Sequence, residues 1–372
     1  MRKSIWMGPW DLAGRKPSQV IDMLRGLGLD ACNLALAYHG GRMLLPTSPR
    51  GLVHELHPGA IYFTRDKTRF PGPLQPEMAP EACLTGPFLE ACREREFPVY
   101  AWTVVCHNDR LGALAPIENV FGERYNYALC PANPAVRDYA AALCGAVASL
   151  PGIAGIDLEA AGYMGYEHAG LHDKRGLPLP AAVVFLLSVC MCSYCSALMG
   201  GAAGEIRREA VSAIRRFLAG EADHAVPPHP ALLEARRIAQ RELLLAIRTS
   251  TAGVPVNLRL SCDPMFAGGK STLQWQDLRG LADTATVTFF GTTRERMAAE
   301  LRNLPPPAAR PLPVWGGYVF HGPDCGDPED VAGRLALLET SELAGGLFYS
   351  FSLAATWHFE WLRRALAGAS KE

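Results

Sequence analysis

Eight short segments rich in β-branched and aromatic residues recur along the chain, and this recurrence constrains the fold more than any other feature. They lie at residues 4–10, 31–39, 98–106, 152–160, 255–262, 284–291, 313–320 and 345–352. Longer amphipathic segments with helical periodicity separate them, including one at residues 272–282. Alternating strands and helices are typical of βα units around a parallel sheet, and eight such units close into a (β/α)8 barrel. The sequence therefore predicts an α/β fold in which residues 1–372 form a single TIM barrel.

Two connections are too long to be simple loops. They span residues 40–82, after the second predicted strand, and residues 162–198, after the fourth. Connections that follow barrel strands lie at the C-terminal face, where barrel enzymes build their active sites. We therefore expect both insertions to wall or cover a pocket; the alternative is that they are decoration without a functional role.

Charge and composition narrow the classes of partner. The formal net charge of −1 removes the electrostatic case for a nucleic-acid partner, because phosphate binding needs a basic face. No segment approaches the ~20 uninterrupted apolar residues that cross a bilayer. The short apolar stretch at the N-terminus is broken by Pro9 and Asp11, which is not typical of a signal peptide. We expect a cytoplasmic protein with a small neutral ligand, no nucleic-acid or membrane partner, and an oligomeric state that the sequence leaves open.

Two carboxylates lie on the fourth predicted strand. Strand side chains alternate between faces, so Asp157 and Glu159 point one way while Ile156 and Leu158 point the other. The acids are expected to face the barrel interior, where burial is costly unless they are paired or used. Glycoside hydrolysis uses two carboxyl groups with different protonation. We predict Glu159 as general acid/base and Asp157 as nucleophile or charge stabiliser, the alternative for Asp157 being a buried structural anchor.

The fifth predicted strand supplies partners for these acids. Arg259 has inward parity and is expected to reach the strand-four pair, where a guanidinium would hold Asp157 ionised and leave Glu159 free to titrate. Asp263 is the candidate second catalytic carboxylate. Because an Asp before a proline is also a common turn starter, Asp263 beside Pro264 has a structural alternative.

Polar and aromatic residues also recur where the other strands end. Flat aromatic faces with hydrogen-bonding neighbours are surfaces on which sugar rings stack. We expect two or three of the aromatic rings to contact ligand and the rest to belong to the core. The predicted substrate-binding residues are Trp6, Tyr38, His39, Trp102, His107, Asn108, Arg259, Trp315 and His321.

A C-x-C-x-x-C motif lies in the second insertion. The chain has 11 cysteines, an odd number, which favours reduced thiols or metal ligands over a disulfide framework. Cys190, Cys192 and Cys195 can close on one zinc ion, with His168 or His172 nearby to complete a tetrahedral site; His172 is the candidate we name. Further candidates that only the fold could bring close are Cys106, His107, Cys130 and Cys262.

Such a site would be structural, because four protein ligands leave no open coordination position. The alternative is three reduced cysteines in a buried segment. An iron–sulfur cluster normally needs four cysteines and is disfavoured. We therefore expect a structural zinc ion and no organic cofactor.

Residues 129–163 resemble an uncharacterised bacterial family of glycoside-hydrolase-like TIM barrels. The resemblance rests on the Asn-Pro-x-Val-Arg helix start at residues 133–137, the acidic fourth strand and the C-x-C-x-x-C insertion, with support from the AYHGGRMLLP and IYF segments. It implies a catalytic role for Glu159. The Asp-x-Glu spacing also looks like the end of the Asp-x-Asp-x-Glu signature of chitinase-type barrels, in which the glutamate donates a proton. Here Gly155 stands at the first position, which argues against a chitinase-like, substrate-assisted mechanism.

These patterns together predict a carbohydrate-active hydrolase with a glycoside substrate. Two other functions stay open. One is a saccharide-binding barrel without activity. The other is a metal-dependent sugar isomerase, epimerase or aldolase that uses His39, His107, Glu159, Asp263 and His321 around a divalent ion.

Overall fold

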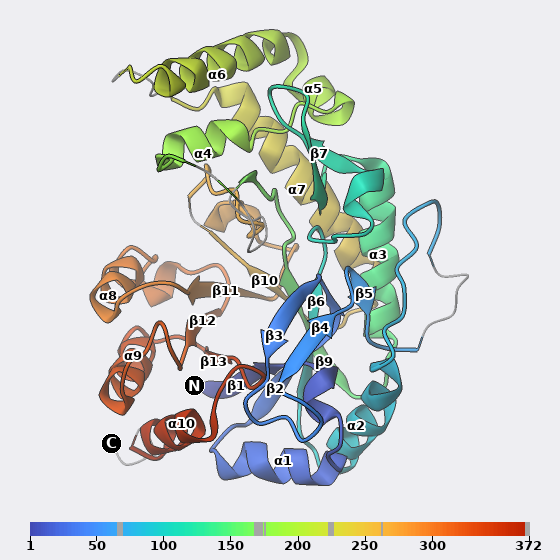
Figure 1. The fold of residues 1–372 in the computed structure, drawn as a ribbon, viewed down its shortest axis with the longest axis vertical. Helices are drawn as coiled ribbons and strands as arrows, with labels where there is room; N and C mark the ends of the chain where they lie inside the picture. The colour runs from blue at the N-terminus through green and yellow to red at the C-terminus, as the bar shows by residue number, and fades with distance from the viewer. Residues whose placement is uncertain (65–69, 167–173, 175, 222–226, 262, 369–372) are drawn as a thin grey trace.

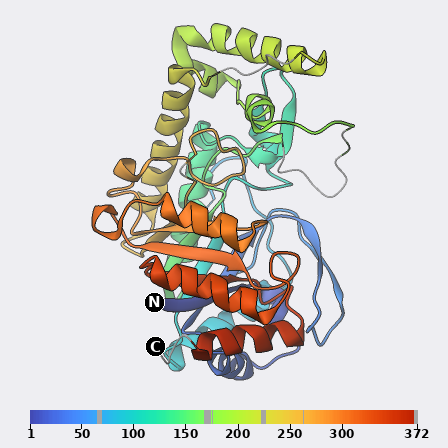
Figure 2. The same ribbon diagram turned by 90° about the vertical axis from the view of Figure 1, so that its left-hand side faces the viewer.

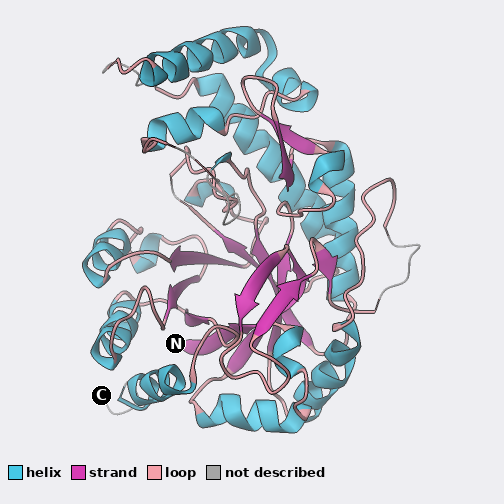
Figure 3. Cartoon of the chain, viewed as in Figure 1, coloured by secondary structure: helices cyan, strands magenta, loops and turns pink. Residues whose placement is uncertain are grey.

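A closed barrel of parallel strands occupies the centre of the computed structural model, which describes residues 1–64, 70–166, 174, 176–221, 227–261 and 263–368. Within these ranges the barrel has eight strands, shown in magenta in Figure 3: β1 (Arg2–Met7), β2 (Ala31–Tyr38), β6 (Val99–Val104), β9 (Ile153–Glu159), β10 (Val256–Arg259), β11 (Thr284–Phe289), β12 (Val314–Val319) and β13 (Gly345–Tyr349). Strand β1 pairs in parallel with both β2 and β13, which closes the sheet. The predicted (β/α)8 barrel is confirmed.

Helices surround the barrel (Figure 1): α1 (Pro17–Gly26), α2 (Ala82–Glu94), α3 (Pro134–Ala148), α7 (Pro230–Ser250), α8 (Arg294–Arg302), α9 (Pro328–Thr340) and α10 (Thr356–Gly368). Local signals start several of them. The Asn133 side chain accepts a hydrogen bond from the Ala135 N–H at 3.0 Å, and Pro134 occupies the first turn of α3, where no N–H partner is needed. Outward strand residues such as Ile156 and Leu158 are fully buried in the core between strands and helices.

The predicted helix at residues 272–282 is wrong. Among the described residues between β10 and β11, the structure has only a short 3-10 turn, Trp275–Asp277. The Asp277 carboxylate closes this turn on the Gln274 N–H and pairs with Arg237 of α7 at 3.0 Å. Because the buried carboxylate anchors the segment to α7, the chain turns here instead of forming the helix that its apolar spacing predicts.

Three connections at the C-terminal ends of the strands are elaborated. After β2, the strands β3 (Gly41–Leu44) and β4 (Val53–Leu56) form an antiparallel hairpin, and β5 (Ala60–Ile61) adds antiparallel to β2. After β6, a second hairpin is formed by β7 (Pro116–Glu118) and β8 (Arg124–Leu129), which the sequence analysis did not predict. After β9 come α4 (Ala181–Leu187), α5 (Ser193–Met199) and α6 (Ala203–Leu218).

These last three helices lie beyond the barrel, and α7 runs from them down the barrel wall, as Figures 1 and 2 show. Their buried apolar side chains, among them Val183, Phe185, Ile206 and Ile214, belong to a cluster that also includes Ala235 and Ala239 of α7. The helical layer is therefore packed on the barrel through α7. No helix in the described ranges is both long and apolar enough to cross a membrane.

Candidate active site

Asp157 on β9 is completely buried and surrounded by donors. The Trp6 indole and the Asn33 amide donate to one carboxylate oxygen at 2.7 and 2.8 Å. The Asn257 amide lies 3.4 Å from the other oxygen, and Arg259 Nη2 lies 3.5 Å from the first. Neutral and charged donors therefore compensate for the burial of this carboxylate on both of its oxygens.

Glu159, two residues further along the same face, has a different environment. Its side chain is 25% exposed, its Oε2 lies 2.8 Å from Arg259 Nη1, and the Trp102 indole donates to the same oxygen. The Arg259 guanidinium thus contacts both acids, and it also lies over the rings of Trp6 and Trp102, 4.6 and 5.3 Å from their centroids. Of the two acids, Glu159 is the one that a ligand can reach.

The backbone that follows Glu159 is strained. Ala160 has φ 52°, in the left-handed region that non-glycine residues rarely adopt. Gly269, with φ 85°, packs against it so closely that a Cβ there would lie 3.3 Å from Ala160 Cα and 3.1 Å from Met164 Cγ. Close packing between the loops after β9 and β10 therefore holds the end of strand β9 in this conformation.

Aromatic side chains line the barrel mouth around Glu159. Tyr38 packs edge-on to Trp102 with ring centroids 4.7 Å apart, and Tyr349 contacts both Trp102 at 6.2 Å and Phe290 at 5.1 Å. The hydroxyls of Tyr38 and Tyr349 share a hydrogen bond, and burial raises the pKa of both phenols, so both stay protonated at neutral pH. Neutral aromatic rings therefore surround the ion pair of Glu159 and Arg259 at the barrel mouth.

Trp315 lies elsewhere. It is near the start of β12, at the N-terminal end of the barrel, where its ring packs edge-on to Tyr100 at 5.4 Å. Two residues further along β12, Gly317 leaves room for the Trp6 indole, because a Cβ at this position would lie 2.6 Å from Trp6 Cη2. Trp315, which was predicted to bind substrate, is therefore not brought to the mouth.

His39, His107 and Asp109 gather beside the mouth. The two imidazole rings stack with centroids 4.1 Å apart and planes 16° apart, and His107 Nε2 lies 3.7 Å from Asp109 Oδ1. Burial, reinforced by His107, lowers the pKa of His39 to about 4, although the nearby charge of Glu159 acts in the opposite direction. For Asp109, burial raises the pKa, but the contact with His107 outweighs this and lowers it to about 2. His39 is therefore neutral and Asp109 ionised at neutral pH.

The side chains of Asn108 and His321 form hydrogen bonds with backbone groups of neighbouring loops. Asn108 is 2% exposed and donates to the carbonyl of Gly59 at 3.1 Å, which fastens the insertion after β2. His321 Nδ1 lies 2.9 Å from the Gly322 carbonyl, and Nε2 accepts a hydrogen bond from the Ser350 N–H at 3.3 Å. Both residues follow barrel strands as predicted, but these contacts connect loops to each other.

Asp263 lines a cavity of 460 Å³ between β10, β11 and α8, together with Lys270 and Glu300. It is exposed, and its Oδ1 accepts from the Met265 N–H at 2.9 Å, as a turn starter does. Burial lowers the pKa of Lys270 to about 8, and the charge of Arg259 adds to this effect. Lys270 was missed by the sequence analysis, because it lies in an irregular connection where no strand parity marks it.

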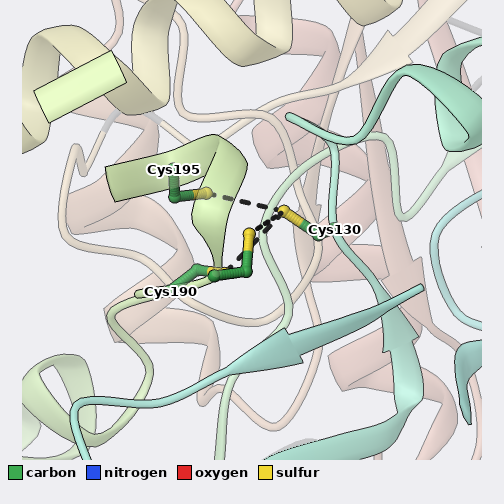
Figure 4. Close-up of side chains that lie close together, drawn as sticks. Cys130, Cys190 and Cys195 are labelled. Atoms are coloured by element: carbon green, nitrogen blue, oxygen red, sulfur yellow. Dashed lines mark hydrogen bonds between the residues drawn. The ribbon is translucent and has the colours of Figure 1, made fainter. Parts of the chain in front are cut away.

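Four cysteines converge between the loop after β8 and the start of α5 (Figure 4). The sulfur of Cys130 lies 3.7, 3.6 and 3.5 Å from those of Cys190, Cys192 and Cys195. Sulfurs about 2.3 Å from a tetrahedral zinc ion are about 3.8 Å apart, so the four thiols can hold a metal ion. The fold thus supplies Cys130 as the fourth member of the cluster; His172 lies outside the described residues.

The surroundings of this cluster favour negative charge. Hydrogen bonds among the thiols raise the pKa of Cys130 and lower that of Cys192, which favours the thiolate form of Cys192. The Tyr163 hydroxyl lies 3.3 Å from the Cys195 sulfur, and the Arg236 guanidinium lies 4.8 Å from the centre of the Tyr163 ring. Arg236 is 3% exposed, and its Nε and Nη1 have no hydrogen-bond partner among the described residues. A buried cation therefore stands beside the thiols.

No protein-family model matches the chain, and no curated protein matches it in sequence. Solved structures do resemble it. An α-L-fucosidase isoenzyme from Paenibacillus thiaminolyticus aligns with TM-score 0.59 and 13% identity over 100% of this chain, and a β-galactosidase from Marinomonas ef1 with 0.59 and 9% over 100%. The PgaB glycoside hydrolase domain from Bordetella bronchiseptica aligns with 0.59 and 13% over 98% of this chain and 99% of its own.

The chain spans 49% of that fucosidase and 60% of that galactosidase. At these identities the likeness shows the fold, a TIM barrel also found in glycoside hydrolases.

Proposed function

We propose that this protein is a glycoside hydrolase that cleaves or rearranges a glycosidic bond, with Glu159 as general acid/base. One observation carries the proposal: Glu159 ends strand β9, is partly exposed, and is held by Trp102 and Arg259 inside an aromatic mouth. Further support comes from the barrel fold that the chain shares with several glycosidases.

The ion pair with Arg259 suits a cycle in which Glu159 begins ionised. Attraction at 2.8 Å favours the carboxylate, which as general base takes a proton from the attacking water, while a second, protonated carboxyl group, for which Asp263 is the candidate, gives its proton to the leaving-group oxygen. A sugar cannot reach Asp157 for nucleophilic attack, because this carboxylate is buried and surrounded by hydrogen-bond donors. We assign it charge stabilisation: its negative charge holds Arg259 in place and favours positive charge developing on the sugar.

Asp263 is our proposed second carboxylate. It is exposed and lines the cavity beside the mouth together with Lys270. Trp102, Tyr38 and His39 are proposed to contact the sugar through their exposed edges, because they lie next to Glu159; Trp102 and Tyr38 are only 2% and 4% exposed, and His39 is stacked between Tyr38 and His107.

The test is replacement of Glu159 by Gln, assayed on a panel of aryl glycosides and oligosaccharides that the wild type cleaves. General acid/base groups contribute about 10²- to 10⁴-fold, so turnover should fall within that range while the thermal unfolding midpoint stays within a few degrees. Glu123→Gln, on the exposed β7–β8 hairpin, is the matched control and should keep full activity. Unchanged turnover in Glu159→Gln would overturn the assignment.

Two other outcomes would replace the proposal. Saccharide binding without turnover on any substrate would favour a non-catalytic barrel. Isomerised or epimerised sugar as product would favour the metal-dependent alternative, although the backbone contacts of His321 set it apart from His39 and His107.

For the four-cysteine cluster we propose a structural zinc ion. Four sulfur ligands leave no open position, and the ion would join the loop after β8 to the insertion after β9. Arg236 would offset part of the charge of four thiolates. Metal analysis should find one zinc ion fewer per chain in Cys190→Ser than in wild type, with a lowered unfolding midpoint, whereas Cys83→Ser, which removes an exposed thiol, should change neither. Purified wild type without metal after growth in zinc would contradict this.

A further inference from the structure

We propose that His39, His107 and Asp109 form a second metal site, open to solvent at the barrel mouth, that binds a divalent transition-metal ion such as Zn²⁺. The residues come from two connections: His39 directly follows β2, and the other two follow β6. Two imidazoles and one carboxylate are a ligand set that suits zinc and its neighbours in the first transition row.

The separations fit an ion with small adjustments of the side chains. One ligand atom from each residue lies within 4.8 Å of the other two. The 3.7 Å between His107 Nε2 and Asp109 Oδ1 is close to the ~3.4 Å expected between two ligands of a tetrahedral zinc ion. The two imidazole rings stack with their centroids 4.1 Å apart, and the lone pair of a neutral imidazole is what binds a metal ion.

Backbone groups of Gly40 orient two of the three ligands. His39 Nδ1 lies 2.7 Å from the Gly40 carbonyl, which can only accept, so Nδ1 carries the proton and Nε2 keeps its lone pair. Asp109 Oδ2 accepts from the Gly40 N–H at 2.6 Å. A Cβ at position 40 would lie 3.1 Å from this oxygen and 3.2 Å from Pro58 Cα, so a larger residue here would have to displace these groups by a few tenths of an ångström. Hydrogen bonds of this kind from backbone to ligand are typical of metal sites.

Three protein ligands leave at least one coordination position open, in contrast to the closed four-cysteine cluster. Tyr38 stacks on His39 at 4.2 Å, and Glu159 is close enough for its charge to act on His39. An ion at this place would hold a water molecule or a sugar hydroxyl next to Glu159. Only this last step rests on the proposed glycosidase function; the metal site itself does not.

The experiment counts metal ions and identifies their ligands. Metal-free protein is titrated with Co²⁺ and then Zn²⁺, with calorimetry for the number of sites and absorption for the ligand type, because thiolate ligands give an intense charge-transfer band that imidazole and carboxylate do not. Wild type should bind two equivalents, only one of them with the thiolate band. His39→Ala and Asp109→Asn should each weaken the affinity of the site without the thiolate band by more than about 100-fold. Both variants should retain binding at the four-cysteine site.

His57→Ala is the matched control: it removes an exposed imidazole from the same insertion and should still bind two equivalents. Cys190→Ser should still bind the metal ion that gives no thiolate band, which shows that the two sites are independent. Binding of a single equivalent by wild type, or two unchanged equivalents in His39→Ala, would overturn the proposal. Since none of these readings requires turnover, failure of the metal site is distinguishable from failure of the glycosidase assignment.

Discussion

Two carboxylates at different heights in the barrel interior have opposite environments. At the lower level Asp157 is completely buried and bonded to Trp6 and Asn33; at the mouth Glu159 is 25% exposed and bonded to Trp102. Both acids share Arg259, the same strand and the same face. The difference is height along the strand, so inward direction identifies both acids but does not say which one is available for chemistry.

The comparison predicts that the lower level contributes stability and the mouth contributes reactivity. Removing a buried, fully bonded carboxylate leaves several donors and a guanidinium without their acceptor, whereas removing a carboxylate at the mouth leaves groups that water can reach. Four predictions test this, from the largest expected effect to the smallest.

Replacement of Asp157 by Ala should lower the free energy of unfolding by about 3–5 kcal/mol, because it leaves Arg259 buried without one of its two acids. Glu159→Gln should cost less than about 1 kcal/mol. Urea unfolding of both variants measures the difference. Equal losses of stability in Asp157→Ala and Glu159→Gln would contradict the proposed division between a stabilising lower level and a reactive mouth.

Asp11 is another buried acid; its carboxylate accepts hydrogen bonds from two neutral donors, the Ser352 hydroxyl and the Gly8 N–H, whereas Asp157 also lies close to the charged Arg259. Burial raises its pKa from 3.8 to about 6. Between about pH 4 and pH 6 the folded protein therefore binds a proton that the unfolded chain releases, so this group's contribution to stability falls as the pH rises, by about 3 kcal/mol in total.

Asp11→Asn removes this titration. The free energy of unfolding of wild type minus that of the variant should fall across the same pH window and stay constant above it. A difference that is flat from pH 4 to pH 6, or that rises with pH, would contradict the shifted pKa.

Gly317→Ala tests the packing that places the Trp6 indole against Asp157. The added methyl would lie 2.6 Å from the indole, and overpacking of this kind costs about 1–3 kcal/mol. Near-ultraviolet circular dichroism should report a displaced tryptophan. Gly322→Ala, where no heavy atom lies within 4 Å of the added group, should leave both the spectrum and the unfolding free energy close to wild type.

Trp102→Phe keeps an aromatic ring beside Tyr38 but removes the N–H that bonds to Glu159. We expect a loss of about 1 kcal/mol in stability, because one hydrogen bond is lost while the buried aromatic ring is kept, and a reduction of about tenfold in kcat/KM with little change in KM. A change confined to KM would indicate that the ring binds sugar and that the hydrogen bond does not position Glu159.

Much of the site follows from a period of two along the strands. The alternation of polar and apolar residues at 152–160 and 255–262 correctly placed Asp157, Glu159 and Arg259 on one face, since strand geometry is a local property. Trp315 was predicted to bind substrate because it lies on a strand, but it lies at the N-terminal end of the barrel; the presence of a residue on a strand carries no information about its height once the strands are staggered in a barrel.

Contacts between distant segments were decided by the tertiary structure alone. The motif at residues 190–195 identified three thiols, but only closure of the barrel brought Cys130 within 3.7 Å of them, and only the packing of two loops brought His39 onto His107. Lys270 lies in a connection without periodicity, and a buried Asp277 turned a predicted helix into a 3-10 turn. The sequence by itself determined the strands, their inward faces and the class of fold, because these depend on neighbours along the chain; the fourth cysteine, the histidine pair and the exposure of Glu159 depend on which strands meet and at what height.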